Sequence, residues 1–404
     1  MLVKLAWRNI WRNKRRSLIV LTAIVVGMVL LMLTESYTAG MMNQMFEDQV
    51  GSHVAHIQIH TKGFNDNKII QNSFTDVGTV EELLGRYPAI AASSRRIQTY
   101  GLASSASNSS GIAIIGVEVQ RESRITKISS WIFEGQYLSG KDREIVIGRG
   151  LAERLGVALG DKVVLMASAL DGQVGSDMFR IVGLFASPSG EFDKSFVYIP
   201  IRYAQRMLAM GDRISEIVLL TKDVELAPQL AKELAPVFGD EYEVTSYRDV
   251  LPALMAILDV RQQAMGVYYL IIGIAVIFGI VNTLLMSVFE RIREFGVLMA
   301  MGMKNGKVFA MIVLEAMILG AVGTVVGLLA GLAVYFPLCK YGLNLSAFAE
   351  GLSWIGVSSI VYPLLTPDAL VRIVTIIPFI SGLAALYPAT KAIRLVPVRA
   401  IYYV

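Results

Sequence analysis

The sequence has few of the residue types that catalytic, disulfide-bonded and metal-binding proteins depend on. It contains one cysteine, Cys339, so no internal disulfide can form. All three histidines fall in one short stretch, HVAHIQIH at 53–60. No G-x-S-x-G nucleophile motif and no metal-ligand spacing is present. The chain is therefore not expected to be an enzyme.

The histidine stretch is predicted to be a structural strand. In an extended strand His53 faces opposite to His56 and His60, and the latter two are roughly 13 Å apart at ~3.3 Å per residue. Ile57 and Ile59 would pack inward while His56 and His60 face water. No metal is expected here.

A complete phosphate-binding loop is also missing. GMKNGKVF, which begins at Gly302, has three residues between its glycines where G-x-x-x-x-G-K-[ST] needs four, and Val308 replaces the required hydroxyl. We expect this chain to bind no cofactor and to hydrolyse no nucleotide itself. Energy for its work has to come from a partner.

Charged residues are scarce, at 17%, whereas hydrophobic residues reach 54% and the mean hydropathy is +0.55. These values are typical of a membrane protein with a sizeable polar part. Four apolar stretches are long enough, with their flanks, to cross a bilayer as helices. No A-x-A cleavage pattern follows the first of them, so we expect an uncleaved membrane helix there.

The large polar region between the first two spans is predicted to be an α+β domain. Helical patterns such as Arg149 to Leu155, which ends at Gly156, alternate there with strand-like runs. These runs are Val54 to Ile59, Gly111 to Val119, Glu144 to Ile147, Lys162 to Met166, Phe179 to Phe185, Ser195 to Ile199 and Glu216 to Leu220.

Basic residues indicate the orientation of the spans. Residues 1–16 hold six of them and no acid, the loop 290–307 four and the tail 390–404 three, whereas the loop 337–370 holds one. The positive-inside rule then places both termini and the loop 290–307 in the cytoplasm and the large domain outside.

The expected organisation follows the chain in order. Helical spacing of apolar residues before the second span predicts that this span continues outward as a stalk, as the first does. The segments are an amphipathic helix 1–17, first span and stalk 18–42, α+β domain 43–247, stalk and second span 248–289, cytoplasmic amphipathic segment 290–307, third span 308–336, outer loop 337–370, fourth span 371–389 and cytoplasmic tail 390–404.

The segment Phe289 to Gly302, FERIREFGVLMAMG, is too polar to lie in lipid. Its charges crowd the start and its apolar residues recur behind them, which predicts a short amphipathic helix docked on another surface.

Two features mark the third span. Gly323, Gly327 and Gly331 put a smooth groove on one helix face that lets another backbone approach, either within one subunit or between subunits. Glu315 lies near its cytoplasmic end. A carboxylate there is costly unless it faces protein or snorkels, so Glu315 is a candidate structural or coupling residue.

Several motifs, in this order and spacing, resemble the FtsX-like permeases of the MacB and LolC/LolE group. The resemblance covers essentially the whole chain and is strongest to the lipoprotein-releasing branch. The motifs are LAWRNIWRNKRRS, SHVAHIQIH, EIVIGRGLAERLGVALGDKVVL, IVGLF, FDKSFVYIPIRYAQRML, ERIREFGVLMAMGMKNGKV, LEA at Leu314 and YPATKAIRLVPVRAI.

This resemblance implies a mechanotransmission permease, a multi-pass protein of the bacterial inner membrane with a MacB-like periplasmic domain inserted between its first two helices. Its partners would be a cytoplasmic ABC ATPase of the LolD or MacB type, which binds the ATP and magnesium, and a second permease subunit, identical or different. No nucleic acid is implied. The segment after the second span would be the coupling helix, contacting the ATPase through Glu290, Arg291, Arg293, Glu294, Phe295 and Gly296 and ending at Gly302.

The lipoprotein-releasing members extract acylated proteins between their first two spans and pass them to a periplasmic carrier. The outer ends here are apolar enough to accept acyl chains from membrane lipids or lipoproteins, through Met32, Tyr37, Met41, Met265, Tyr268 and Tyr269. LolC carries a long carrier-binding hairpin, whereas the connection Ala167 to Asp177 is short. The alternatives are a MacB-like efflux permease and an FtsX-like regulator of a periplasmic hydrolase.

Overall fold

The computed structural model describes residues 2–12, 14–354 and 357–393. Arg394 and Arg399 of the predicted tail 390–404 lie outside the described residues. The chain separates into two compact units. The helical unit comprises Met1–Met42, Leu258–Asn344 and Ile360–Val404, and the sheet unit comprises Asn43–Ile257 and Leu345–Ser359. Each is described by itself.

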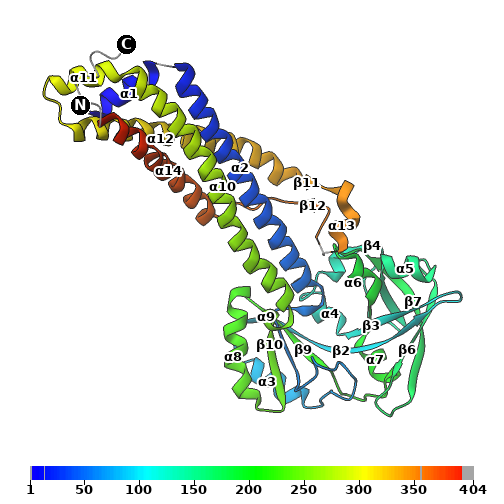
Figure 1. The fold of residues 1–404 in the computed structure, drawn as a ribbon. Helices are drawn as coiled ribbons and strands as arrows, with labels where there is room; N and C mark the ends of the chain where they lie inside the picture. Colours follow the sequence, from blue (N-terminus) through cyan, green and yellow to red (C-terminus); the bar gives the residue numbers. More distant parts are fainter. Residues whose placement is uncertain (1, 13, 355–356, 394–404) are drawn as a thin grey trace. The chain divides into compact units, whose positions relative to one another are not determined.

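The helical unit is built on four helices that are long and apolar enough to cross a membrane, which confirms the four predicted spans by length and composition. They run alongside one another, with two short helices, α1 and α11, at one end (Figure 1). The helices are α1 (Leu2–Arg12), α2 (Lys14–Gln49), α10 (Pro252–Glu290), α11 (Ile292–Ala300), α12 (Asn305–Tyr341) and α14 (Pro367–Ile393).

The two predicted stalks are continuous with their spans, because α2 and α10 are each a single unbroken helix. Helix α12 also extends beyond the predicted end of the third span. Helix α12 passes Phe336 and includes Pro337 before it ends at Tyr341. The loop that follows holds a small antiparallel pair, β11 (Leu343–Asn344) with β12 (Ile360–Val361).

The glycine row of α12 packs within the subunit. A Cβ at Gly323, Gly327 or Gly331 would come within 2.6, 3.0 and 2.5 Å of Ile24, Met28 and Met32 of α2, respectively. The three glycines therefore let α2 approach the α12 backbone, as small residues do between membrane helices. The sequence left open whether this glycine groove packs within one subunit or between subunits. In the described chain it packs within the subunit.

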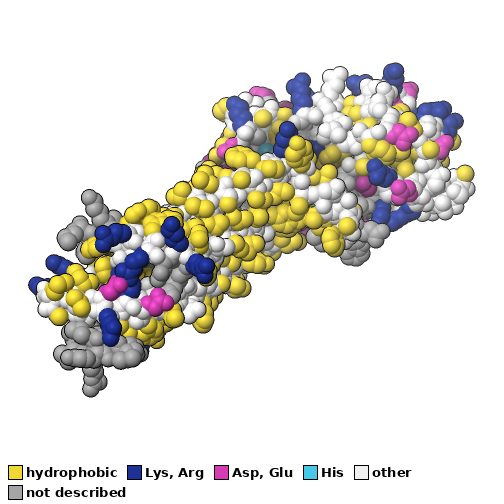
Figure 2. Space-filling view, turned by 90° about the horizontal axis from the view of Figure 1, so that it is seen from above, with side chains coloured by type: hydrophobic (Ala, Val, Ile, Leu, Met, Phe, Trp, Pro, Cys, Tyr) yellow, Lys and Arg dark blue, Asp and Glu magenta, His cyan; other side chains and the backbone are white. Residues whose placement is uncertain are grey.

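The outward face of the long helices is apolar. Hydrophobic side chains cover them in a broad band, in which few charged side chains are seen (Figure 2). Leu270, Phe278, Leu329 and Phe379 are each more than 60% exposed within this band. Large apolar side chains exposed on all sides of a helix bundle are suited to contact with lipid tails.

The sheet unit contains a ten-stranded mixed sheet. Its strands overlap all seven predicted runs, although the first begins only at Ile57 because Val54 lies in a π-helical turn, and three further strands, β2, β4 and β10, were missed by the sequence analysis. The bounds are β1 (Ile57–Thr61), β2 (Ile90–Ser104), β3 (Ser109–Val117), β4 (Ile132–Gly135), β5 (Glu144–Gly148), β6 (Lys162–Ser168), β7 (Val174–Phe185), β8 (Phe196–Pro200), β9 (Glu216–Thr221) and β10 (Tyr242–Ser246).

Six of these strands close into a ring through the pairings β2–β3–β8–β5–β7–β6–β2. Gly101 permits the closure, because a Cβ there would come within 2.3 Å of the Met166 carbonyl oxygen on β6. Each strand contributes to one buried apolar cluster, with side chains such as Ile97, Ile114, Ile147, Leu165, Phe179 and Val197. Each such side chain contributes about 1.5–3 kcal/mol through burial.

Strands β9, β1 and β10 extend the sheet beyond β2 and form a second apolar cluster with α3 and α8. The loop between α12 and α14, predicted as part of one outer loop, divides between the units: Leu345–Ser359 belongs to the sheet unit, where α13 contacts α6. The helices of this unit are α3 (Val77–Leu84), α4 (Val119–Glu122), α5 (Arg149–Leu155), α6 (Gly190–Ser195), α7 (Ile201–Met207), α8 (Ala227–Phe238), α9 (Tyr247–Val250) and α13 (Ala349–Trp354).

The prediction for the histidines is partly wrong. His60 is fully buried rather than facing water, because β1 lies between β9 and β10 and is covered on both faces. His53 precedes the strand, in a π-helical turn, Val50–Val54, that follows α2. Burial, together with nearby cations, lowers the pKa of His53 to about 3. Among the described residues, no group of three or more metal-ligating side chains is placed to hold an ion.

Candidate functional site

The segment predicted to be a coupling helix is tied to its neighbours by a buried ion pair. Arg291 lies at the break between α10 and α11, and its Nη1 donates to Glu315 Oε1 of α12 at 3.1 Å. Both side chains are at most 8% exposed. Asn9 of α1 donates to the same Oε1 at 2.7 Å. The Glu315 carboxylate is thus satisfied by protein, as an acid in an apolar helix requires.

Two further contacts extend this group outward. The Nε of Arg291 donates to Glu294 Oε2 at 3.1 Å, and Arg12 of α1 donates to Glu294 Oε1 at 2.7 Å. Burial tends to raise the pKa of Glu294, but the hydrogen bonds from Arg12 and Arg291 outweigh it and lower the pKa below its ordinary value. We call Asn9, Arg12, Arg291, Glu294 and Glu315 the Arg291 cluster. It joins α1, α11 and α12.

Phe295 fixes the inner face of α11. It is 1% exposed and packs in a cluster with Val308, Met311, Ala389 and other buried residues from α10, α12 and α14. The guanidinium of Arg291 lies 5.0 Å from the Phe295 ring centroid, close enough for a cation–π contact. The helix therefore has one face committed to the bundle.

Gly302 allows the chain to leave α11 and enter α12. Its φ is +93°, in the left-handed region that glycine adopts without a Cβ clash. Its N–H donates to the Met299 carbonyl at 3.0 Å, and the Met303 N–H donates to the Leu298 carbonyl at 3.0 Å. These bonds satisfy the last carbonyls of the helix.

The predicted coupling residues divide into two sets. Arg291, Phe295 and Gly296 are buried within the chain, whereas Glu290, Arg293, Glu294 and Gly302 are exposed. Val297 and Met301, which the sequence analysis did not select, are 47% and 73% exposed. The outer face of α11 therefore combines charges with two exposed apolar side chains, a composition suited to binding another protein. We call Arg293, Glu294, Val297 and Met301 the α11 face.

The predicted acyl-chain contacts divide as well. Met32 and Met265 are buried, with Met32 packed against Gly331, whereas Tyr37, Met41 and Tyr269 are partly exposed and Tyr268 is 47% exposed. Tyr269 instead donates to Glu35 Oε2 at 3.2 Å. In this structure Tyr268 offers the most surface of the six.

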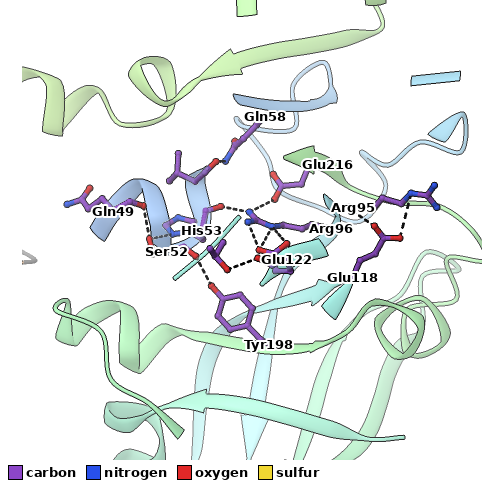
Figure 3. A network of polar contacts seen from close by, with 12 residues as sticks. Gln49, Ser52, His53, Gln58, Arg95, Arg96, Glu118, Glu122, Tyr198 and Glu216 are labelled. Carbon is purple, nitrogen blue, oxygen red and sulfur yellow. Dashed lines mark hydrogen bonds and ion pairs between the residues drawn. The ribbon is translucent and has the colours of Figure 1, made fainter. Parts of the chain in front are cut away.

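A buried charge cluster in the sheet unit lies beside the end of the first stalk (Figure 3). Arg96 of β2 is 1% exposed and forms ion pairs with Glu122 of α4 at 2.6 Å and with Glu216 of β9 at 3.4 Å. It also donates to the carbonyl oxygen of His53, in the π-helical turn after α2. We call Arg96, Glu122 and Glu216 the Arg96 cluster.

The charge balance of this cluster favours a permanent cation. Burial opposes the charge of Arg96, but Glu122 and Glu216 outweigh it and raise the pKa of the guanidinium. Tyr198, whose hydroxyl donates to the Ser52 carbonyl at 3.4 Å, has its pKa raised by burial. The end of the stalk is therefore held in the sheet unit through backbone carbonyls of its last turn.

The second stalk begins beside the end of the first. The ring of Phe46, on α2, meets the ring of Tyr247 edge to face at 5.0 Å. Tyr247 starts α9, a single turn capped by Ser246 and Asp249, and α10 begins at Pro252. Both stalk ends are thus fixed to one another inside the sheet unit.

The sequence analysis selected Glu315 but missed its partner Asn9, and it missed Glu35 and Arg96. Glu35 carried a usable signal, since a lone acid at the end of an apolar span indicates a specific partner. Arg96 carried none. Nothing in a segment that also contains Arg95 indicates which of two adjacent arginines faces inward.

Sequence comparison shows similarity to two described families. Residues 17–237 match the MacB-like periplasmic core domain, and residues 266–397 match the FtsX-like permease C-terminal family. Together the two matches extend over most of both units.

Three relatives illustrate the similarity. The lipoprotein-releasing system transmembrane protein LolC of Xylella fastidiosa is 24% identical over 302 residues, which cover 71% of this chain and 72% of LolC. The corresponding LolE of Haemophilus influenzae is 24% identical over 425 residues, covering 97% of each chain. The macrolide export ATP-binding/permease protein MacB of Wolinella succinogenes is 24% identical over 421 residues, covering 99% of this chain and 60% of MacB.

Proposed function

Because the chain belongs to the ABC transporter permeases that combine a MacB-like periplasmic core domain with an FtsX-like permease C-terminal region, we propose that a separate cytoplasmic ATPase drives it through the α11 face. In this proposal ATP and magnesium bind to that partner, and hydrolysis takes place there rather than in this chain. A second permease subunit, a copy of this chain or a related one, completes the transporter.

The observation that carries this proposal is the way α11 is held. Its inner face is fixed by Phe295 and the Arg291 cluster, while Val297 and Met301 remain exposed on a helix outside the apolar band. A force on the α11 face reaches α10 through Arg291 and α12 through Glu315. Helix α10 is unbroken from Pro252 to Glu290 and can pass the movement along its axis.

The proposed orientation places α1, α11 and both termini in the cytoplasm and the sheet unit in the periplasm of a bacterial inner membrane. The basic residues support it, because residues 1–16 hold six and the loop 290–307 four, whereas the loop 337–370 holds one, and cytoplasmic loops carry an excess of lysine and arginine. The amphipathic helix α1, with Trp7 and Trp11 exposed, fits the headgroup level on the same side.

Reversing the charge of Arg293 is expected to weaken the association with the ATPase. Arg293 is exposed on the α11 face, so Arg293→Glu changes the docking surface without disturbing the bundle. Loss of a charge pair at an interface costs about 1–3 kcal/mol, or about a 5- to 150-fold loss of affinity. The association is measured by co-purification of the ATPase with this chain in detergent and by the stimulation of ATP hydrolysis. Lys391→Glu, exposed at the end of α14, is the control. Unchanged association of the Arg293 variant would remove this residue from the interface.

We further propose that the transported substrate is an acylated lipoprotein. The transporter extracts it from the inner membrane and passes it to a periplasmic carrier for delivery towards the outer membrane. The match to LolE over 97% of both chains supports this substrate. The β6–β7 hairpin, which turns between Ser168 and Val174, is short, so a carrier would bind elsewhere on the sheet unit.

Efflux is the second candidate, since MacB matches at the same 24% identity. A photoreactive residue at Tyr268 or Met41 is expected to crosslink to acylated lipoproteins during ATP turnover, because these side chains are accessible beside the outer ends of α10 and α2. The same group at Met265, which is buried, is the control. Crosslinks to macrolides or peptides, with none to lipoproteins, would support efflux instead.

A further inference from the structure

A charged groove lies among the helices of the helical unit, at the end opposite α11. Glu35 of α2 is 4% exposed and forms ion pairs with Arg261 of α10 at 3.4 Å and with Arg372 of α14 at 3.7 Å. Tyr269 donates to its other oxygen. These residues line a groove of about 520 Å³, together with Asp259 and others.

The groove has more donors than its own acceptors satisfy. One carboxylate serves two guanidinium groups, each with five N–H donors. The Nε of Arg261 is buried and has no hydrogen-bond partner among the described residues. A buried donor without an acceptor destabilises the folded chain, so an acceptor-rich group such as a phosphodiester would stabilise this site.

A second, apolar groove of about 460 Å³ adjoins the first. Tyr269 and Arg372 line both, and Thr375, Ile376 and Phe379 of α14 complete the apolar one. At 1.5 Å per residue, Phe379 lies roughly 10 Å along α14 from Arg372, towards the middle of the apolar helices. Glu35 lies roughly 26 Å along α2 from Leu18, where the apolar run begins, close to the ~30 Å thickness of a hydrocarbon core.

A charged groove followed by an apolar groove fits an amphipathic molecule with a polar headgroup and an acyl chain. The charged groove lies at the depth of headgroups, and the apolar groove continues into the depth of acyl chains. We propose that the two grooves bind a membrane phospholipid, with its phosphate against Arg261 and Arg372 and an acyl chain along Ile376 and Phe379. This resident lipid goes beyond the proposed transport of lipoproteins and does not depend on it.

The charges of the lining select the headgroup. Glu35 and Asp259 balance Arg261 and Arg372, so a zwitterionic headgroup enters without adding net charge. Its phosphate meets the guanidinium groups and its ammonium meets Asp259, which is exposed at the groove. A phosphoethanolamine lipid is therefore preferred over an anionic phosphoglycerol lipid.

Native mass spectrometry of the full chain in detergent tests this site. The probes are dioleoylphosphatidylethanolamine, dioleoylphosphatidylglycerol and dioleoylglycerol, which share their acyl chains and differ in the headgroup. We expect retention of the ethanolamine lipid to exceed that of the diacylglycerol by at least about fivefold, equivalent to about 1 kcal/mol, with the phosphoglycerol lipid between them.

Arg372→Gln is expected to reduce retention of the ethanolamine lipid to the level of the diacylglycerol, and Phe379→Ala to weaken all three lipids alike. Both side chains are at least 60% exposed, and Glu35 keeps its ion pair with Arg261 in the Arg372 variant, so the helices are expected to stay packed. Lys391→Gln, near the other end of α14, is the control. Equal retention of all three lipids, preference for phosphoglycerol, or an unaltered Arg372 variant would overturn the proposal. None of these outcomes concerns the ATPase.

Discussion

Replacing Arg96 with methionine is expected to destabilise the sheet unit by about 3–5 kcal/mol, because it leaves buried carboxylates without their counter-charge. Glu122 and Glu216 are 0% and 1% exposed, so water cannot take the place of the guanidinium. The carbonyl of His53 loses its donor as well. A change of this size lowers the unfolding temperature of a domain this large by about 6–20 °C. The unfolding temperature is measured on the full chain in detergent, with limited proteolysis as the readout of unfolding.

Arg95→Met is the matched control for this experiment. Arg95 is the adjacent residue and also forms ion pairs, with Glu81 and Glu118, but its side chain and theirs are 22–33% exposed. Partly solvated pairs contribute about 1 kcal/mol or less, so the unfolding temperature should fall by only a few degrees. Equal effects of the two substitutions would show that burial of the Arg96 cluster does not matter. Arg96→Met combined with Glu122→Gln should recover part of the loss.

Replacing Arg291 with methionine is expected to abolish most ATP-driven activity while the four spans still insert. The substitution removes the cation paired with Glu315, which is 5% exposed within an apolar helix, and breaks the link from α11 to α12. Removing one member of a buried pair costs about 3–5 kcal/mol, enough to release the first turn of α11. We expect at least a tenfold loss of substrate-dependent ATP hydrolysis in the reconstituted complex.

The double variant Arg291→Met with Glu315→Gln separates the ion pair from packing. A neutral amide can still accept from Asn9 and removes the uncompensated charge, so partial recovery of activity is expected if electrostatics hold α11 in place. Wild-type association and activity in the single variant would contradict the role of the Arg291 cluster.

The exposed ion pair between Arg12 and Glu294 is expected to matter less. Exposed pairs contribute about 0.4 kcal/mol, so Arg12→Gln should change the ATP hydrolysis activity less than twofold.

The spans and most strands could be predicted because each depends on a local pattern. Sixteen apolar residues from Leu18 specify a membrane helix, and runs such as Glu144 to Ile147 specify buried strands, whatever the rest of the chain does. The amphipathic character of Phe289 to Gly302 likewise marked α11 before its partners were known. These features required no information on distant contacts.

The missed features depend on residues far apart in sequence. Strand β2 has a polar sequence, IAASSRRIQTYGLAS. It becomes a strand because β9 pairs with its first part, β3 pairs with its second part, and β6 pairs with its last four residues as well. The buried His60 ring contacts Thr245 of β10, which lies almost two hundred residues later in the chain. The place of Asn9 in the Arg291 cluster could not be predicted either, because it depends on a contact between α1 and α12. Partners of this kind have no local signal.

Coupling through α11 is tested most directly by a photocrosslinking residue at Val297, which is 47% exposed on the α11 face. Crosslinking in whole cells is expected to capture one cytoplasmic ATPase with this chain, and the yield should change when ATP hydrolysis is blocked. The same residue at Phe278, which is 78% exposed in the apolar band, should capture no ATPase. Capture of lipid alone at Val297, or equal ATPase capture at both positions, would contradict docking of the ATPase on α11.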